Sequence, residues 1–241
     1  MSITQLYTPE EFFQSVKQNE FKLGQICWVP IPQPDPIPRI LDVQRNTPQE
    51  HDEIKFELRL ANQKSDFKQS DRNLPIKYLN LHSNEELLAQ RCKKRPAIII
   101  ASGVECFPDI SRILKQKGKK HQQEDCLFVI PCYDVQKDEY GTGFIQPIVA
   151  RTQCLMYRQF FYIPQSKRFT ELVARFDRIQ VVIDRSPASI DPSDVSLSYE
   201  IFNLFLSMFL FCISGKTNEH LETVKAIVRE SYAEEKSDIG S

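Results

Sequence analysis

The stretch RCKKRPAIIIASG, residues 91–103, decides the fold class. Pro96 fixes one φ angle and favours an extended backbone at Arg95. The three isoleucines at 98–100 are β-branched, and a short uninterrupted apolar run is typical of a strand that is buried on both faces. Arg95 therefore stands at the mouth of a buried strand. A base in that place is either a solvated charge at the strand edge or a group that binds RNA or takes part in catalysis.

Further strands are expected along most of the chain. The segments 39–45 and 54–60 alternate apolar and polar residues and are joined by a polar link, so they are expected to pair antiparallel. The segment LVARFDRIQVVI, 172–183, also has strand character, but its alternation slips between Phe176 and Ile179, which indicates a β-bulge. The remaining strands are expected at 25–31, 97–101, 126–132 and 160–163.

Helices are expected where capping signals precede apolar periodicity. Capping boxes at 8–11 and 83–86 predict a short helix carrying Phe12, Phe13 and Val16, and a two-turn helix ending near residue 91. The other helices are expected at 147–159, 199–214 and 219–231, with Gly215 ending the 199–214 helix. The segments 32–38, 61–73, 107–125 and 185–194 are expected to be loops or long connections.

Composition excludes several classes of protein. The 241 residues carry a formal net charge of −1, so no protein-wide field attracts nucleic acid or a membrane, and a nucleic-acid partner would need a local basic patch. Seven cysteines without a Cys-x-x-Cys motif favour free thiols and a cytoplasmic location. Scattered histidines and the lack of a P-loop or dinucleotide motif predict neither a metal nor a cofactor.

The most apolar stretch, 201–214, is too short to span a bilayer and carries Asn203 and Ser207. No membrane association is therefore expected. A weaker alternative is peripheral attachment through the apolar side chains between Phe202 and Ile213, which requires those side chains to be exposed.

Four segments, taken in order, raise a family resemblance. GQICWVPIP (24–32), RPAIIIAS (95–102), LFVIPCYDV (127–135) and LVARFDRIQVV (172–182) are similar to successive strands of the MazF/PemK-type toxins. That resemblance implies a mainly β protein with added helices, α+β, built on a small SH3-like barrel of about five to seven strands. It also implies a homodimer, a metal-independent endoribonuclease activity on single-stranded RNA, and an antitoxin protein as a partner.

The resemblance carries over to particular residues. Arg95 matches the catalytic arginine, and a guanidinium offers a planar fork for phosphate oxygens and for the charge that develops on a phosphorane. The family's second residue, a threonine or similar small polar group, falls on or next to Tyr133. Tyrosine departs from that pattern, so either Tyr133 or Asp134 substitutes for it, or the activity has been lost.

A cluster of cations is expected to contact RNA phosphates. Its alternative is a solvated surface, since charge runs are common on exposed loops. Its members flank the Arg95 strand or lie in the connection that follows it: Lys93, Lys94, Arg112, Lys115, Lys117, Lys119 and Lys120. The aromatic run YRQFFY, 157–162, offers either base-stacking surfaces or core contacts, and Arg175, Asp177 and Arg178 form either an ion-pair network at the subunit interface or a solvated group.

The expected organisation has three parts. Residues 1–23 form an N-terminal helical segment, 24–185 the barrel domain with insertions at about 61–90 and 103–124, and 186–241 a C-terminal helical region. The doubled length and the missing threonine leave a second hypothesis open, a non-catalytic member of the same fold that serves as a binding or scaffold module. Whether the 61–90 insertion covers the RNA groove also stays open.

Overall fold

A computed structural model describes residues 2–44, 55–67, 85–103, 105–136, 141–183 and 185–239. Within these residues the chain is a mixed α+β protein with eleven strands and six α-helices. The helices and 3-10 turns are α1 (Ile3–Leu6), α2 (Pro9–Phe12), α3 (Pro108–Gln116), η2 (Lys120–Gln123), α4 (Gln146–Gln153), η3 (Phe176–Arg178), α5 (Tyr199–Ser214) and α6 (Glu219–Ile239). The strands are β1 (Phe13–Ser15), β2 (Gln25–Pro32), β3 (Arg39–Gln44), β4 (Lys55–Leu60), β5 (Leu88–Ala89), β6 (Cys92–Ser102), β7 (Leu127–Asp134), β8 (Phe160–Ile163), β9 (Leu172–Arg175), β10 (Gln180–Val182) and β11 (Asp191–Leu197).

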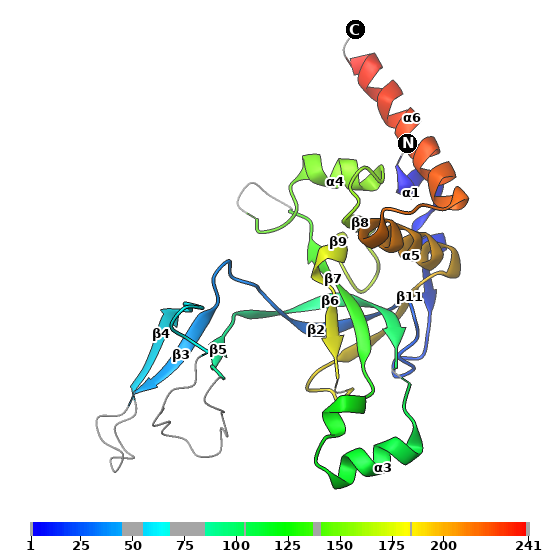
Figure 1. Ribbon diagram of the computed structural model, residues 1–241. Helices are drawn as coiled ribbons and strands as arrows, with labels where there is room; N and C mark the ends of the chain where they lie inside the picture. The colour runs from blue at the N-terminus through cyan, green and yellow to red at the C-terminus, as the bar shows by residue number, and fades with distance from the viewer. Residues whose placement is uncertain are drawn as a thin grey trace. The chain divides into compact units, whose positions relative to one another are not determined.

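The larger sheet has eight strands in the order β1-β11-β2-β6-β7-β9-β8, with β10 pairing the first half of β7. The pairs β1–β11, β11–β2, β6–β7, β7–β9, β8–β9 and β7–β10 are antiparallel. The sheet curls into a half-barrel (Figure 1). The mixed α+β class and the barrel-like sheet that the sequence predicted are thus confirmed.

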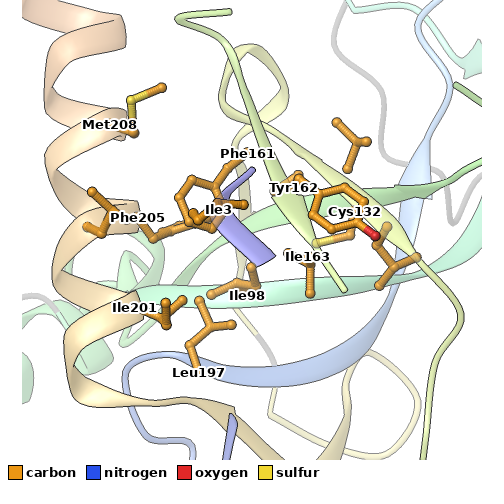
Figure 2. Packing of buried hydrophobic residues seen from close by; sticks show 14 of the residues in the cluster. Ile3, Ile98, Cys132, Phe161, Tyr162, Ile163, Leu197, Ile201, Phe205 and Met208 are labelled. Carbon is orange, nitrogen blue, oxygen red and sulfur yellow. The ribbon is translucent and has the colours of Figure 1, made fainter. Parts of the chain in front are cut away.

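The predicted buried strand lies in the middle of this sheet. Residues 97–99 of β6 are fully buried between β2 and β7, so the apolar run 98–100 packs as its composition predicted. Helix α5 covers one end of the sheet, and Figure 2 shows Ile201, Phe205 and Met208 of α5 facing the sheet residues around Phe161. The rings of Phe161 and Phe205 meet edge to face with centroids 5.2 Å apart, an arrangement that aromatic pairs favour.

Helix α5 begins and ends as the sequence predicted. The Ser198 side chain accepts a hydrogen bond from the Ile201 amide, and Gly215 ends the helix in the left-handed conformation at φ 73°, which glycine adopts at no steric cost. Its buried residues are Ile201, Phe202, Leu204, Phe205 and Met208, whereas Tyr199 at its start and Leu210 and Ile213 near its end are exposed. In the described residues no single helix has the length and apolarity to cross a membrane, although α5 and the first part of α6, bent by 98°, pass that test as a pair.

The chain divides into two compact units, Met1–Pro30 with Lys94–Ser241, and Ile31–Lys93. The second unit holds the three-stranded sheet β4-β3-β5, in which β3 and β4 pair antiparallel as predicted. Arg59 of β4 binds the Asp66 carboxylate through two nitrogens, at 2.8 and 2.9 Å, and also pairs with Asp42. Residues 68–84 of the predicted 61–90 insertion lie outside the described part, and the sequence-based division at residues 23 and 185 stays a prediction.

The structure corrects several local predictions. The slip between Phe176 and Ile179 is not a bulge, because the 3-10 turn η3 separates β9 from β10, so the two strands pair different halves of β7. The box at Thr8 and Glu11 does cap a helix, but that helix ends at Phe12, since Phe13 joins β11 as strand β1. Likewise the helix from Pro147 ends at Gln153 rather than at 159.

Two further predictions failed because pairing decided the outcome. The helix expected after the 83–86 box is absent from its described residues, 85–91, where Leu88–Ala89 instead pairs with β3. The loop expected at 185–194 ends earlier, because β11 begins at Asp191 and fills the gap between β1 and β2. The 107–125 segment, which was expected to be a loop or a long connection, contains the helix α3.

Candidate functional site

Strand register gathers one row of side chains at the end of β7. Ala97 of β6 pairs with Pro131 of β7, and continuing this antiparallel register by two residues sets Arg95 opposite Tyr133. On the other side Tyr133 pairs with Val173 of β9. Arg175, two residues further along β9, points to the same face and is therefore a diagonal neighbour of Tyr133.

Both arginines pack on the Tyr133 ring. The guanidinium carbon of Arg95 lies 4.4 Å from the ring centre, and that of Arg175 lies 5.4 Å from it. Both distances are within the range of a cation–π interaction. Arg175 also lies over Phe160, its partner across the strands, at 5.8 Å. The Tyr133 ring thus contacts two cations, one from each of the strands that flank β7.

Two carboxylates accompany these cations in different ways. Asp177 accepts a hydrogen bond from Nε of Arg175 at 3.0 Å and a second one from Nη2, and this bonding raises the pKa of Arg175. Asp134 lies 3.8 Å from Nη1 of Arg95, too far for a hydrogen bond between these atoms. The side chain of Arg95 is 19% exposed and that of Asp134 is 43% exposed, so the carboxylate is open to solvent while the arginine is held by its surroundings.

The segment that follows β7 forms the opposite wall. Phe144 binds back to the end of β7, since its amide donates to the Asp134 carbonyl at 3.0 Å and its carbonyl accepts from the Gln136 amide at 2.9 Å. This approach requires Gly143, because a Cβ atom there would stand 2.6 Å from the Asp134 carbonyl oxygen and 2.8 Å from the Gln136 nitrogen. The predicted turn at 141–143 is thereby confirmed and acquires a specific role.

Between these walls lies a pocket of about 450 Å³. It brings together Arg95, which matches the family's catalytic arginine, with Tyr133 and Asp134, the two alternatives for the family's second residue. The other lining residues come from β9 and from the 142–148 segment at the start of α4: Thr142, Gly143, Phe144, Ile145, Ile148 and Arg175.

The residues predicted to bind RNA phosphates are not gathered in this way. Arg112 and Lys115 belong to α3, Lys117 and Lys119 follow it, and Lys120 begins η2. This connection joins Ser102 to Leu127, which is the end of the β6–β7 pair remote from Arg95 (Figure 1). Seven residues of strand separate Arg95 from Ser102, roughly 23 Å at about 3.3 Å per residue.

Some of these cations lie beside carboxylates instead. Lys115 and Lys120 line a second pocket of about 330 Å³ together with Glu124 and Asp125. Lys94 pairs with Asp191 at 2.8 Å. Lys93 is exposed and belongs to the Ile31–Lys93 unit. The cations of the α3 connection and Arg95 thus lie at opposite ends of the β6–β7 pair, and their role as one RNA-binding surface stays a prediction.

The thiols near the site are inert. Cys132 precedes Tyr133 on β7 and is fully buried, and burial raises its pKa well above the usual value. All seven cysteines lie in described ranges, and none of them forms a disulfide there. The described residues contain no group of three or more His, Cys, Asp and Glu side chains that could hold a metal ion.

Two polar members of the pocket, Arg175 and Thr142, are not among the site residues that the sequence indicates. For Arg175 the sequence leaves an ion-pair network at the subunit interface and a solvated group as alternatives. The structure shows ion pairs of Asp177 with Arg175 and Arg178, and the Arg175 side chain also lines the pocket. Thr142 carried no signal of its own. Thr142 lines the pocket because residues 142–144 return to the end of β7. The Gly-Thr-Gly sequence predicts that the chain turns here, but not which strand it returns to.

Comparison of the chain with family models, with curated proteins and with solved structures gives no match.

Proposed function

We propose that the protein is a metal-independent endoribonuclease of the MazF/PemK type, with an SH3-like barrel as the basis of its half-barrel, and that it cleaves single-stranded RNA at the pocket around Tyr133. The observation that carries this proposal is the convergence of Arg95, Tyr133 and Asp134 on one pocket. Arg95 comes from the 95–102 segment and the consecutive pair Tyr133 and Asp134 from the 127–135 segment, and the two segments form adjacent strands with these residues at the same end.

The proposed reaction is an in-line displacement at phosphorus. The ribose 2′-oxygen forms a bond to phosphorus, the bond to the 5′-oxygen breaks, and the products are a 2′,3′-cyclic phosphate and a 5′-hydroxyl. Asp134, whose side chain is more exposed than that of Asp177, takes the 2′-hydroxyl proton. The Tyr133 hydroxyl donates a proton to the leaving oxygen. Arg95 stabilises the charge on the phosphorane, a role for which a preorganised guanidinium is suited.

The test is incubation of the purified protein with a long single-stranded RNA in the presence of EDTA, beside Arg95→Ala and Arg95→Lys. Discrete cuts with cyclic-phosphate ends that vanish in Arg95→Ala are expected. Arg95→Lys should retain only part of the activity, because lysine keeps the charge but not the planar fork. Cleavage that is unchanged in Arg95→Ala would rule out this mechanism.

The proposal extends to partners. The family resemblance implies a homodimer with its interface at 172–182 and an antitoxin that blocks the site. An apolar row on and beside β10 supports self-association: Ile179, Val181 and Ile183 alternate along the strand, and each is more than 40% exposed. Light scattering of the wild type and of Val181→Glu would show a dimer that the substitution dissociates if this row is the interface.

A second candidate function, a non-catalytic binding module for a protein partner, is favoured by a feature of the Ile31–Lys93 unit. Its edge strand β4 presents Phe56, Leu58 and Leu60 on one face, all exposed by more than half. Exposed apolar rows of this kind are typical of interaction surfaces. Intact RNA in both the wild-type and Arg95→Ala reactions would favour this function.

A further inference from the structure

The pocket joins a cationic wall to an apolar wall. Arg95 and Arg175 form the cationic side, both positioned by the Tyr133 ring at 4.4 and 5.4 Å. Phe144, Ile145 and Ile148 form the apolar side. Such a division fits a ligand that is anionic at one end and flat and apolar at the other.

The pocket offers an anion hydrogen-bond donors rather than a net positive charge, because Asp134 and Asp177 balance the charges of Arg95 and Arg175. Among its lining residues there are two arginines and one carboxylate, Asp134. Asp177 binds the Nε and Nη2 edge of Arg175 and does not line the pocket. A guanidinium has five N–H donors, so this bonding orients Arg175 and leaves donors on Nη1 and Nη2 beyond the two that Asp177 takes.

The apolar wall is accessible rather than part of the core. The side chain of Ile145 is 49% exposed and Ile148 is half-buried. Phe144 is fixed by its two backbone bonds to the end of β7 and by edge-to-face packing on Phe160, with centroids 4.9 Å apart. An aromatic ring next to one exposed and one half-buried isoleucine offers a surface on which a nucleobase can stack or lie.

We propose that this pocket is a subsite for a single unpaired nucleotide, in which Arg95 and Arg175 together bind one phosphate and the wall of Phe144, Ile145 and Ile148 receives the attached base. In this proposal Arg175 binds the phosphate directly, as Arg95 does. This inference rests on the proposed function for the choice of RNA as the natural ligand, but it concerns binding and not cleavage. A volume of about 450 Å³ lies within the range of sites for single small molecules, roughly 300–1,000 Å³.

The test measures binding of ligands that cannot be cleaved. Calorimetry with the four nucleoside 5′-monophosphates, a 2′-deoxy trinucleotide, uridine and inorganic phosphate should give clear binding for the nucleotides and the trinucleotide. Binding should be much weaker for the nucleoside and for phosphate, each of which engages only one wall. Equal affinity for inorganic phosphate and for the nucleotides would overturn the role of the apolar wall.

Matched variants test the roles of the cationic wall and of the apolar wall separately. Arg175→Gln should weaken nucleotide binding by about 10- to 100-fold, the value of one charge-assisted hydrogen bond. Arg178→Gln is the control: it removes the same charge three residues away, and Arg178 pairs with Asp177 at 3.6 Å without lining the pocket. Ile145→Ser should weaken the binding of nucleotides and leave that of phosphate unchanged. Equal effects of Arg175→Gln and Arg178→Gln would overturn the inference. They would indicate that nucleotide binding responds to the overall charge of the region and not to direct contact between Arg175 and the phosphate.

The binding and cleavage readouts fail separately. Nucleotide binding that depends on Arg175, with RNA left intact, would support the subsite and refute the endoribonuclease. RNA cleavage that depends on Arg95 but is unaffected by Arg175→Gln, with no nucleotide binding by the wild type, would support the endoribonuclease and refute the subsite. Circular dichroism and the unfolding midpoint of each variant show whether weaker binding reflects a loss of fold.

Discussion

The guanidinium of Arg95 lies over the ring of Tyr133, with 4.4 Å between its central carbon and the ring centre. The two residues are distant in sequence and become neighbours only through the β6–β7 register. Tyr133 therefore contributes in two separable ways. Its ring positions a cation, and its hydroxyl is available for proton transfer.

Substitutions at Tyr133 should separate these contributions. Tyr133→Phe keeps the ring, so we expect nucleotide binding and stability to stay near wild type, while cleavage falls by roughly 10²- to 10⁴-fold if the hydroxyl donates the proton. Tyr133→Leu also removes the cation–π interaction and should weaken nucleotide binding. Single-turnover cleavage and calorimetry provide the two readouts. Full cleavage by Tyr133→Phe would transfer the acid role to another group.

Gly143→Ala should damage the pocket. The added methyl group meets backbone atoms at 2.6 and 2.8 Å, and these cannot move without breaking the bonds that join 142–144 to β7. We expect the unfolding free energy to fall by roughly 1–3 kcal/mol, as for other overpacked sites, together with a loss of nucleotide binding. Thr142→Ala is a control for stability only, since Thr142 is exposed but lines the pocket. Denaturant melts that coincide for Gly143→Ala and wild type would contradict the proposed steric role.

Gln25→Leu should destabilise the core of the sheet. The Gln25 side chain is fully buried, donates to the carbonyls of Gln18 and Ser193 at 2.8 and 2.7 Å, and accepts from the Lys22 amide at 2.8 Å. Leucine leaves these backbone groups without that partner, so a loss on the order of 3 kcal/mol is expected. Gln14→Leu, which removes a hydrogen bond to the Leu197 carbonyl at an exposed position, should cost far less. Urea titration of both variants measures the difference.

The cysteines should react in a defined order. Burial raises the pKa of Cys27 to about 12 and that of Cys132 well above its usual value, so at about pH 8 neither supplies thiolate. Cys92 and Cys106 are exposed. We expect iodoacetamide to modify these two first in native buffer, and all seven in denaturant, as followed by peptide mass spectrometry. Early label on Cys27 or Cys132 would indicate that β2 and β7 open in solution.

Cations of the α3 connection should matter only for long RNA. They lie at the end of the β6–β7 pair that is remote from the pocket. Lys117→Gln with Lys119→Gln should leave trinucleotide binding unchanged and should lower the salt dependence of binding to a strand of about 20 nucleotides, by about 0.7 in the log–log slope for each phosphate that is no longer neutralised. Anisotropy titrations at several salt concentrations measure both. An unchanged slope with the long strand would show that this surface is simply solvated.

Local sequence determined much of the framework. The β-branched residues that follow Pro96 form the central strand β6, and the alternation of apolar and polar residues predicts the β3–β4 pair. The capping residues Ser198 and Gly215 placed the ends of α5. These features depend on dihedral preferences and on the burial of one face, which are properties of a few adjacent residues. The same local signals failed at 88–89 and at 191–194, where pairing with distant strands decided the conformation.

The site was decided by tertiary structure. Sequence alone indicated Arg95, Tyr133 and Asp134 as candidates, through separate motifs and a resemblance, but no local pattern related Arg175 or Thr142 to them. Their convergence depends on the register of β6 and β9 against β7 and on the close return of Gly143. Register is set by the sum of many cross-strand interactions over the whole sheet. For the same reason the basic residues at 112–120, adjacent to Arg95 in the order of elements, lie at the other end of the strand pair.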